Sequence, residues 1–534
     1  MAADHRPWHE GISRYQWLVL LIASLGWVFD IFEGQIFVAS MRESMPDLLG
    51  VYPDHPDVYK WSDRAFGFFL LGGAFGGVIF GMISDRIGRS RTLIYTILFY
   101  SIFTCLSAFS QEAWQLAALR FLVAMGVGGE WAVASAMVAE VMPNRSRAVT
   151  SSIFHASSVF GTLLAVGAMA ILWSGTLTGY LDQWNIKPWQ AGFMIGILPA
   201  LLTLWIRWKL KEPESWVAAK ERSETDSTQA VGRIGELFSK ENRRNTAIGV
   251  TLATVGLVTF WGGHIYGKNA LLRTEQARVL KREQMPSSML DKGKYPGEWR
   301  LLVNRHKIFI QKIISEGEGA PDKDLTKRQK RILSGSLIRA REYHKAMLSV
   351  DKKESNDAHK KVHNWLKQFY FSQHKKNLKN EEHIAMALNT VGAGLGLVLF
   401  GWISNRLGRR GAFVFYHVGA FIMMLVLFKG LLANDASRTI LMICLPVFGF
   451  FTVGMHAGYA VYFPELYPTR LRGTGTGFCF NMGRLGTAAA FFGFAAMTSP
   501  PTPETKAMWL APLFLLGIVV VLFAKETKDL ELPE

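Results

Sequence analysis

Charged residues are scarce in this sequence of 534 residues. They make up 19% of the chain, whereas a soluble globular domain carries about 25%. Half of the residues are hydrophobic, 13% are aromatic, and the mean hydropathy is +0.16. This composition argues against a soluble enzyme and favours a protein that crosses a membrane several times.

Cysteine is also rare, with only Cys105, Cys444 and Cys479. All three lie inside apolar stretches, and their spacing fits neither a metal site nor a disulfide framework. We therefore expect them to be packing residues, and we expect no metal site. Zinc-ligand spacing is also absent among the histidines in or near apolar stretches, which are His155, His264, His417 and His456.

Nucleotide-binding motifs are absent as well. The glycine-rich strings match neither the dinucleotide fingerprint that follows a strand nor a phosphate loop that ends in Gly-Lys-Ser or Gly-Lys-Thr. This absence argues against an ATP-driven pump on the same chain, and we expect no organic cofactor. We interpret most of the glycine strings as sites of close helix packing, at Gly73-x-x-x-Gly77-x-x-x-Gly81, Gly392-x-Gly394-x-Gly396 and Gly473-x-Gly475-x-Gly477.

Positive charge is concentrated in one segment. The net charge is +17, and residues 268–382 hold 27 Lys and Arg against 14 Asp and Glu, which leaves 32 against 28 elsewhere. Because basic and acidic residues alternate within the segment, we do not expect it to bind nucleic acid. Residues such as Trp299, Leu302 and His306 follow each other at helical spacing, so we expect a small helical domain.

Twelve apolar segments are long enough to cross a bilayer, for which a helix needs about 20 residues. Their approximate limits are 16–40, 64–84, 91–110, 113–139, 149–173, 188–208, 245–266, 383–404, 411–432, 438–462, 474–497 and 507–524. We therefore predict an all-α membrane protein of twelve transmembrane helices, in which the basic segment is an insertion between helices 7 and 8.

Arginines predict the orientation, because short cytoplasmic loops collect basic residues. The loops after segments 2, 4, 8 and 10 hold ten arginines: Arg86, Arg89, Arg91, Arg145, Arg147, Arg406, Arg409, Arg410, Arg470 and Arg472. The loops on the other side hold five basic residues: Arg42, Lys60, Lys187, Arg438 and Lys506. We predict a multi-pass protein of the cell membrane with both termini in the cytoplasm. The insertion is then extracytoplasmic, and it is too long for the charge rule, which covers loops up to about 60 residues.

Two motifs occur twice in the same order. Gly81-x-x-x-Asp85-Arg86-x-Gly88-Arg89 recurs 320 residues later as Gly401-x-x-x-Asn405-Arg406-x-Gly408-Arg409-Arg410. Glu140-x-x-Pro143-x-x-x-Arg147 recurs 325 residues later as Glu465-x-x-Pro468-x-x-x-Arg472. The repeat indicates two pseudo-symmetric six-helix halves, an architecture that binds transported solutes near the midplane between the halves.

The repeat gives a division of the chain into five parts. We predict an N-terminal six-helix half at 1–210, a cytoplasmic linker at 211–244 and helix 7 at 245–267. The basic insertion follows at 268–382, and the remainder of the C-terminal half, helices 8 to 12, lies at 383–534.

The chain resembles the major facilitator superfamily over all twelve segments. The resemblance rests on these repeated motifs and on the strings Arg120 to Trp131, Glu212-Pro213-Glu214-Ser215 and Tyr462 to Arg484. Within this superfamily, the chain resembles the proton-coupled metabolite and carboxylate symporters, which include sialate and lactate permeases. The motifs that carry this resemblance are Asp30-x-x-Glu33 after Trp27 and Asn481-x-x-Arg484. The chain departs from that pattern in its insertion and at Asn405, Ser90 and Ala124, where the family has Asp, a basic residue and Gly.

The resemblance implies a conformational latch at the cytoplasmic ends of the helices. A carboxylate there accepts hydrogen bonds from the N-terminus of a neighbouring helix and pairs with an arginine. The alternative is that the arginines only set the topology. Because Asn405 keeps a hydrogen bond but loses the charge, we expect the second copy to be weaker. The candidate latch residues are Gly81, Asp85, Arg86, Gly88, Arg89, Arg91, Glu140, Arg147, Gly401, Asn405, Arg406, Gly408, Arg409, Arg410, Glu465 and Arg472.

Charged residues that fall well inside the predicted membrane helices are Asp30, Glu33, Arg120, Glu130 and Arg484. Each costs roughly 2.5–3.5 kcal/mol at a helix centre on insertion scales, so each tends to face a cavity or a partner. Glu33 and Arg120 lie at similar depth, about 10 Å from the outer end, and we expect them to meet. Asp30 shares the face of Glu33, and two carboxylates in a poorly hydrated cavity resist joint ionisation, as a proton carrier requires.

We therefore predict that Asp30, Glu33 and Arg120 couple a proton to transport. The alternative is a static ion pair that only fixes helix packing. The candidate cargo-binding residues are Arg120, Glu130, Trp261, Asn389, Tyr459, Asn481 and Arg484. Helix pairing remains open for Glu130, and snorkelling or a contact with Asn481 remains open for Arg484.

The sequence predicts a secondary active transporter rather than an enzyme. We expect it to move a small organic solute, a carboxylate, by proton-coupled symport with alternating access. The alternatives are a proton-coupled efflux antiporter of the same fold and a non-transporting sensor or docking protein that uses the insertion. The expected partners are the lipid bilayer and a small organic anion, the coupling ion is a proton, and the expected oligomeric state is a monomer.

Overall fold

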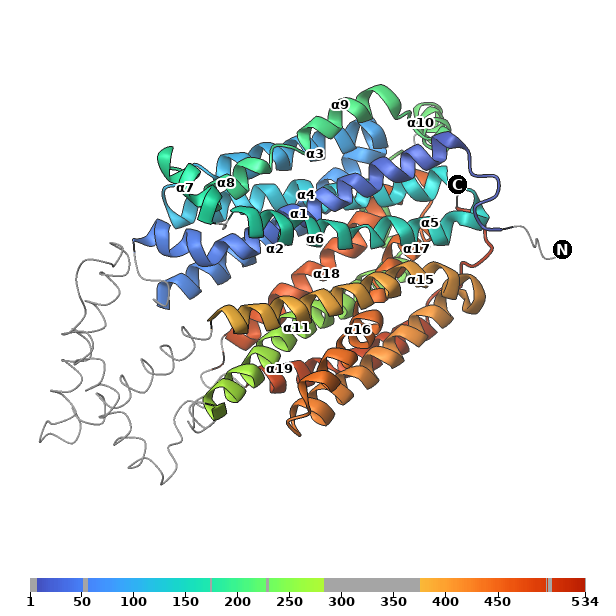
Figure 1. Cartoon of the computed structure of the whole chain (residues 1–534). Coiled ribbons are helices and arrows are strands. Elements are labelled where there is room, and N and C mark those ends of the chain that lie inside the picture. Colours follow the sequence, from blue (N-terminus) through green and yellow to red (C-terminus); the bar gives the residue numbers. More distant parts are fainter. Residues whose placement is uncertain are drawn as a thin grey trace, which may run out of the picture. The chain divides into compact units, whose positions relative to one another are not determined.

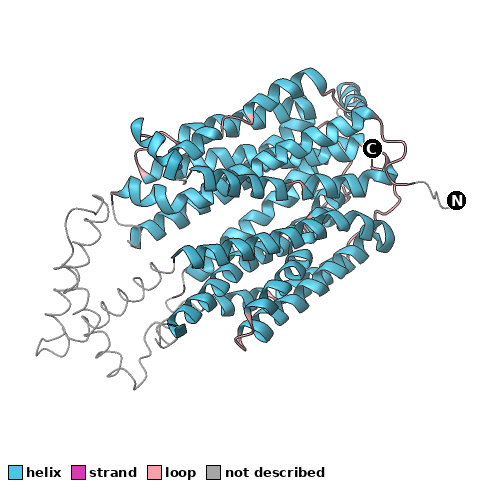
Figure 2. Cartoon of the chain, in the orientation of Figure 1, coloured by secondary structure: helices cyan, strands magenta, loops and turns pink. Residues whose placement is uncertain are grey.

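The computed structural model describes residues 7–50, 56–172, 175–226, 230–282, 375–495, 497 and 502–533. Within these ranges every regular element is a helix, as Figure 2 shows. The prediction of an all-α membrane protein is confirmed.

Nine helices precede the linker. They are α1 (Arg14–Leu49), α2 (Pro56–Ile87), α3 (Arg89–Ser107), α4 (Ala113–Val141), α5 (Asn144–Ala156), α6 (Ser158–Leu172), α7 (Gly175–Gln183), α8 (Pro188–Ile195) and α9 (Ala200–Lys209) among the described residues. Local sequence sets the limits of α1. Ser13 and Gln16 form a reciprocal capping box at its start, with hydrogen bonds of 3.2 and 2.8 Å, and Gly50 ends it with a φ of 64°.

The linker and the second half follow. The linker holds α10 (Glu214–Thr225) and the short helix η2 (Ile234–Phe238). The remaining described elements are α11 (Arg243–Arg282), α15 (Lys375–Met424), η4 (Leu425–Leu432), α16 (Arg438–Gly454), α17 (Ala457–Glu465), η5 (Thr469–Leu471), α18 (Arg472–Ala495), α19 (Pro503–Leu510) and α20 (Pro512–Leu522).

Eight helical stretches in the described part of the chain are long and apolar enough to cross a membrane. They are Arg14–Met41, Arg64–Ile87, Ala113–Val141, Asn144–Met169, Arg243–Gly263, Ile384–Leu432, Arg438–Glu465 and Glu504–Leu522. The stretch Ile384–Leu432 contains two predicted segments, because two helices meet at Gly408 inside α15. The number of twelve transmembrane helices stays a prediction.

The chain divides into two compact units. One comprises Met1–Gly267 and Ala387–Glu534, and the other is Lys268–Met386. Most of the second unit lies outside the described residues, so the predicted helical character of the insertion at 268–382 lies outside them too, apart from its two ends. The predicted domain boundaries remain predictions.

Within the first unit, long helices run side by side, and α18 lies against α2 and α4 of the opposite half (Figure 1). Glycines allow this close approach. A Cβ on Gly81 of α2 would come 2.7 Å from the Gly473 carbonyl oxygen of α18. A Cβ on Gly477 of α18 would likewise collide with the backbone of Gly77. The glycine strings that contain Gly77 and Gly477 therefore allow α2 and α18 of the two halves to pack closely.

Candidate functional site

Arg89, at the start of α3, is the centre of a buried network. Its Nη1 donates to Asp85 Oδ1 at 2.5 Å, while Nε and Nη2 donate to the Glu140 carboxylate at 3.3 and 2.9 Å. Nη2 also donates to the Thr469 carbonyl at 3.0 Å. The three charged side chains are fully shielded from solvent, so these charge-assisted bonds fix the ends of α2, α3 and α4 relative to each other.

The second half repeats this arrangement around Arg409. Its Nη1 donates to Asn405 Oδ1 at 3.2 Å and to Ser404 Oγ at 2.9 Å. Nε and Nη2 donate to Glu465 at 3.0 and 2.9 Å. Since Asn405 is neutral, Arg409 has one ion pair among the described residues, where Arg89 has two.

Glu212 caps the helix that begins at Arg89. Its carboxylate accepts hydrogen bonds from the backbone N–H groups of Arg89, Ser90 and Arg91 at 2.6, 3.2 and 3.3 Å. The preceding residue, Gly88, has a φ of 114°, and a Cβ there would come 2.4 Å from the carboxylate. Only glycine fits this position, because it has both the required backbone conformation and no side chain.

Glu526, just after α20, caps the corresponding helix start in the second half. Its carboxylate accepts from the N–H groups of Arg409 and Arg410 at 2.9 and 3.1 Å. Gly408 precedes them with a φ of 80°, and a Cβ there would come 2.6 Å from Glu526 Oε2. The internal repeat therefore extends to the segments that follow the last helix of each half.

Hydrogen bonds of this region also join the two halves. Asp85 of α2 accepts from the Gly473 N–H at 3.1 Å and from the Thr474 N–H and hydroxyl at 2.8 and 2.5 Å, so it caps the start of α18. Arg472 of α18 donates to Glu140 of α4 at 2.9 Å. Any movement that separates the halves at this end must break these bonds.

Further along the helices, other side chains also join α4 of the first half to α17 and α18 of the second half. The Trp131 ring of α4 stacks on the Phe480 ring of α18 with centroids 3.8 Å apart. Ser135 of α4 donates to the Ala460 carbonyl of α17 at 3.4 Å. The structure therefore shows the state in which this end of the protein is shut.

Both chain ends lie at this end as well. Arg145 donates to the Pro7 carbonyl at 2.7 Å, and Arg472 donates to the Pro533 carbonyl at 2.8 Å. Figure 1 marks the two termini on the same side. The ends of the chain and the arginine network thus share one side, and the assignment of that side to the cytoplasm stays a prediction.

Glu33 of α1 and Arg120 of α4 meet in an ion pair that is almost completely buried. Arg120 Nη2 also donates to Ser107 Oγ at 2.5 Å, and Thr104 donates to Glu33 Oε1 at 3.1 Å. All these partners belong to the first half. The pair therefore lies inside one bundle, where it ties α1 to α3 and α4.

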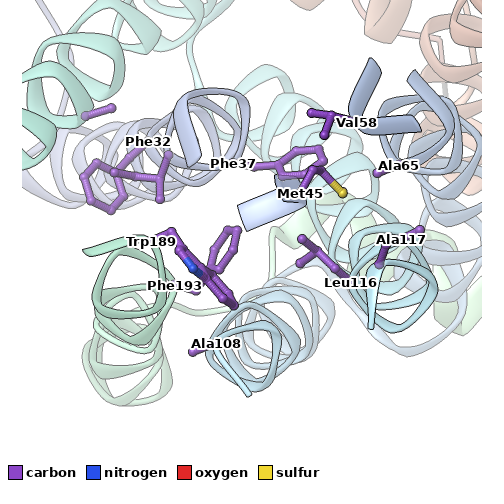
Figure 3. Close-up of a cluster of buried hydrophobic side chains, with 13 residues drawn as sticks. Phe32, Phe37, Met45, Val58, Ala65, Ala108, Leu116, Ala117, Trp189 and Phe193 are labelled. Atoms are coloured by element: carbon purple, nitrogen blue, oxygen red, sulfur yellow. The ribbon is translucent and has the colours of Figure 1, made fainter. Parts of the chain in front are cut away.

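Aromatic rings enclose this ion pair. The Arg120 guanidinium lies 5.2 Å from the Phe37 ring centroid and 4.6 Å from that of Phe193. Figure 3 shows both rings in a cluster of buried side chains that also contains Leu116 and Trp189. The guanidinium is thus bonded to Glu33 and Ser107 and flanked by two rings, while its Nε has no hydrogen-bond partner among the described residues.

Asp30 of α1 lies against Glu130 of α4, within reach of a hydrogen bond between the two carboxyl groups. Both side chains are buried, and none of their four oxygens has a donor in regular geometry among the described residues. Their polar neighbours include the Tyr100 hydroxyl of α3. A Cβ on Gly26 would collide with the Glu130 carboxylate, so this glycine creates the space that the acid occupies.

Arg484 of α18 completes this group from the opposite half. Its charge interacts with that of Asp30. The guanidinium lies 5.7 Å from the Phe480 ring centroid and occupies space left by Gly73 and Gly128, where a Cβ would collide with it. No hydrogen bond or short ion pair of Arg484 occurs among the described interactions.

The other candidate cargo residues are more scattered. Asn481, one turn before Arg484, donates to the Gly477 and Gly128 carbonyls at 2.9 and 3.4 Å. The buried Tyr459 hydroxyl donates to the Leu252 carbonyl at 3.1 Å, and the Trp261 ring contacts that of Phe66 at 5.3 Å. Asn389 Oδ1 is buried without a partner in the described part of the chain. Of these four residues, Asn481 lies on the same helix as Arg484, and both side chains contact Gly128 of α4.

The remaining latch candidates are either packed against backbone groups or exposed to solvent. Arg147 Nε donates to the Ala139 carbonyl at 3.1 Å, and Arg410 donates to the Leu522 carbonyl at 2.8 Å. Gly401 packs against the backbone of Ala148. Arg86, Arg91 and Arg406 are exposed, which suits a role in membrane topology.

Comparison with known proteins decides the family. The family described as "Sugar (and other) transporter" matches residues 35–261 and 364–534. The chain belongs to this transporter family. The resemblance to the major facilitator superfamily is thereby confirmed.

Individual relatives of the transporter cover much of its length. It is 25% identical to the cis,cis-muconate transport protein of Acinetobacter baylyi over 466 residues, 86% of this chain and 84% of that one. It is 27% identical to the sialic acid transporter NanX of Escherichia coli over 219 residues, 41% of this chain and 49% of that one. It shares the fold of the proton:xylose symporter XylE, with a TM-score of 0.59 at 16% identity over 98% of each chain. The protein is a membrane transporter of small organic solutes and not an enzyme.

Sequence reasoning missed several residues of the transporter's networks. Glu526 carries the same cap as Glu212, and both follow the last predicted helix of a half, so the repeat itself contained this signal. Thr474 and Thr469 left no such signal, because they act through contacts between halves that the sequence does not reveal. Tyr100 was also missed, since a lone tyrosine in an apolar helix fits ordinary packing.

Replacing Asp85 by Asn should slow transport by the protein. The change keeps the size of the side chain but removes the charge that accepts four hydrogen bonds and pairs with Arg89, so the shut state loses stability relative to the open one. We expect turnover in proteoliposomes to fall several-fold, with a normal amount of inserted protein. Asn405→Asp is the matched control and should be tolerated, because it adds a charge beside Arg409. An unchanged rate in Asp85→Asn would remove Asp85 from the gating movement.

Replacing Glu526 by Gln should lower stability in a pH-dependent way. Burial by itself raises the pKa of Glu526. The backbone N–H groups of Arg409, Lys528, Arg410 and Thr527 donate hydrogen bonds that together lower the pKa by more than burial raises it, so the pKa lies below its usual value. A lowered pKa in the folded state adds stability above the unfolded value of about 4.3, and this stability is lost as pH falls through the folded value. We expect a loss of about 1 kcal/mol at pH 7, typical of a helix cap.

Thermal unfolding in detergent measures this effect. The melting temperatures of Glu526→Gln and of the unchanged protein should differ at pH 7 and converge as pH falls below about 4.3. A difference that stays constant over this range would show that the carboxylate charge does not stabilise the cap.

Proposed function

We propose that this protein carries a small organic carboxylate across the membrane together with a proton. The observation that carries the proposal is the group of two buried acids, Asp30 and Glu130, with the partly buried Arg484 from the opposite half. Relatives named for cis,cis-muconate and sialic acid, both carboxylates, support the cargo class, and the fold shared with a proton:xylose symporter supports the coupling ion.

Asp30 and Glu130 are the proton site in this proposal. Two carboxylates in contact and away from water cannot both be ionised at low energy. One proton is therefore retained and shared, so the pair has a charge of −1. The pair takes up a second proton from the side to which the cavity opens.

Arg484 is the cargo ligand. When the pair has a charge of −1, it compensates the guanidinium charge, and the empty site is neutral. When the pair takes up its second proton, the guanidinium loses that compensation and binds the cargo carboxylate, which again gives a neutral site. Asn481, one turn away, donates its amide hydrogens to backbone carbonyls, and its unpartnered Oδ1 accepts a hydrogen bond from a hydroxyl group of the cargo.

Coupling follows from these two neutral states. The protein changes its orientation either empty or with one proton and one monocarboxylate bound, because the intermediate states would bury an uncompensated charge at a cost of several kcal/mol. Proton uptake and cargo uptake therefore occur together. The movement breaks the bonds of Asp85 and Glu140 across the two halves when the cytoplasmic end opens.

The Glu33–Arg120 pair has a structural role in this proposal. Its partners all lie in the first half, and it stays neutral throughout the cycle. We assign the pair to packing of α1 against α3 and α4, and not to cargo binding.

Uptake by the purified protein in proteoliposomes tests the function. A panel of labelled solutes should include aliphatic and aromatic monocarboxylates, a dicarboxylate, a neutral sugar and an amine. We expect a carboxylate to accumulate when the outside is acidic, and to equilibrate only when no pH gradient is applied. Accumulation of the sugar in preference to every acid would contradict the proposed cargo class.

A further inference from the structure

The segment just before α1 forms a compact turn. The Glu10 N–H donates to the Pro7 carbonyl at 3.0 Å, which closes the turn. Ser13 then begins the capping box of α1, so the turn is attached directly to the start of that helix. We name residues 7–12 the N-terminal strap. Because its chain continues into α1, the strap moves with the first half of the protein.

Two helices of the first half hold the strap. Arg145, in the first turn of α5, donates to the Pro7 carbonyl at 2.7 Å. The Trp8 ring meets the Trp17 ring of α1 edge to face, with centroids 6.1 Å apart and ring planes at 65°. Such pairs attract because the positive edge of one ring faces the negative face of the other. These two contacts fix the Trp8 ring on the first half.

The same Trp8 ring also contacts the second half. Its centroid lies 5.8 Å from that of the Trp402 ring of α15, with the ring planes at 87°. Trp402 directly follows Gly401, and a Cβ on Gly401 would come 2.7 Å from the Ala148 carbonyl oxygen of α5. Gly401 therefore marks a place where α5 of one half meets α15 of the other. The strap crosses from one half to the other beside this place.

Opening of this end of the protein must break the contact between Trp8 and Trp402. Trp8 is held by the first half and Trp402 belongs to the second, so the two rings separate when the halves separate. Separation returns apolar ring surface to water and loses the attraction between the rings. The contact with Trp17 lies within one half and is kept in both states. Only the Trp8–Trp402 contact therefore shifts the balance between the shut state and the open state.

We propose that the N-terminal strap is a conformational device that holds the end with the arginine networks shut. Its contact with Trp402 stabilises the shut state and limits how often this end opens. The strap lies at the surface, where Pro7, His9 and Glu10 are exposed, so it releases without unpacking the helices. This proposal does not depend on the proposed cargo or on proton coupling.

Distance measurements between two spin labels test the strap in the full-length protein in lipid nanodiscs. The labels are attached at Arg91→Cys on α3 and Arg406→Cys on α15, because both native side chains are exposed and belong to opposite halves. Every sample also carries Cys105→Ser, since Cys105 is partly exposed whereas Cys444 and Cys479 are buried. Pulsed electron–electron double resonance then gives the populations of the shut and the open distance.

Trp8→Ala should raise the ratio of open to shut protein roughly 2- to 10-fold, the range that one aromatic pair accounts for. Trp402→Ala should have an effect of the same size, because it removes the other ring of the pair. The double variant should be no more open than the single variants, since the contact is lost only once. Trp184→Ala is the matched control, because this ring is 78% exposed between α7 and α8, and it should leave the ratio unchanged.

Trp8→Phe separates the ring contact from a general disturbance of the strap. It keeps an aromatic ring at this position and should recover much of the shut population that Trp8→Ala loses. An unchanged ratio in Trp8→Ala would overturn the proposal. Effects of Trp8→Ala and Trp402→Ala that add in the double variant, or a Trp8→Phe protein as open as Trp8→Ala, would overturn it as well.

Discussion

Accumulation driven by a pH gradient is lost when Asp30→Asn and Glu130→Gln are combined, whereas cargo exchange between equal pools continues. In the double variant the pair is permanently neutral, so the loaded site stays neutral but the empty site retains the uncompensated charge of Arg484. The empty protein then fails to reorient. We expect cargo in proteoliposomes to reach no more than its outside concentration, with exchange within a few-fold of the original rate.

Single variants test whether one of the two acids is enough for coupling. Either one alone leaves a titratable carboxyl beside Arg484, so coupling should persist with a changed pH dependence. Asp47→Asn is the matched control on α1, since Asp47 pairs with Lys187 at the surface and should not affect accumulation. If the double variant still concentrates cargo with the original pH dependence, the proton travels through another group.

Replacing Arg120 by Met should unfold a large part of the protein. The change keeps an apolar stem of similar length but leaves Glu33 as an unpaired charge inside the first half, and such losses cost about 3–5 kcal/mol. Denaturant or thermal unfolding in detergent should show this loss directly. Glu33→Gln together with Arg120→Met removes both charges and should recover much of the stability.

The exposed pair of Lys187 and Asp47 is the control for this prediction. It also joins α1 to the start of α8, but Lys187→Met should cost less than about 1 kcal/mol, because surface ion pairs contribute little. If Arg120→Met folds with unchanged stability but has lost transport, the ion pair belongs to the coupling machinery and not to packing.

The repeat of Asp85-to-Arg89 and Glu140 in the sequence indicated the residues that form the two arginine networks, of which the Asn405 copy has one ion pair and the other copy has two. It succeeded because both copies keep the same spacing, so the same contacts form in both halves. The caps of Glu212 and Glu526 show that even the segments after the last helices obey this repeat.

The sequence did not predict that Asp30 pairs with Glu130. Asp30 and Glu33 are three residues apart, so they share a face but point about 60° apart around the helix axis. This difference directs Glu33 toward Arg120 and Thr104 and places Asp30 against Glu130. Depth along a helix was predictable from the sequence, whereas the neighbour across the helix depends on how the helices pack.

The two arginines illustrate the same limit. Arg120 and Arg484 both looked like anion ligands, since each lies alone in an apolar helix. The structure separates them, because Arg120 is bonded to Glu33 and Ser107 and Arg484 has neither kind of bond in the described part of the chain. Orientation, and not sequence position, decides which of them has close polar partners.

Proton movement driven by cargo alone tests the coupling most directly. Proteoliposomes with a pH-sensitive dye inside, and no imposed gradient, receive a transported monocarboxylate outside, with protein-free vesicles as the control for passive entry. The account predicts acidification of the interior at one proton per carboxylate, and no acidification above the control for the Asp30→Asn, Glu130→Gln double variant. Carboxylate uptake without proton movement, or the same acidification in the double variant, would contradict it.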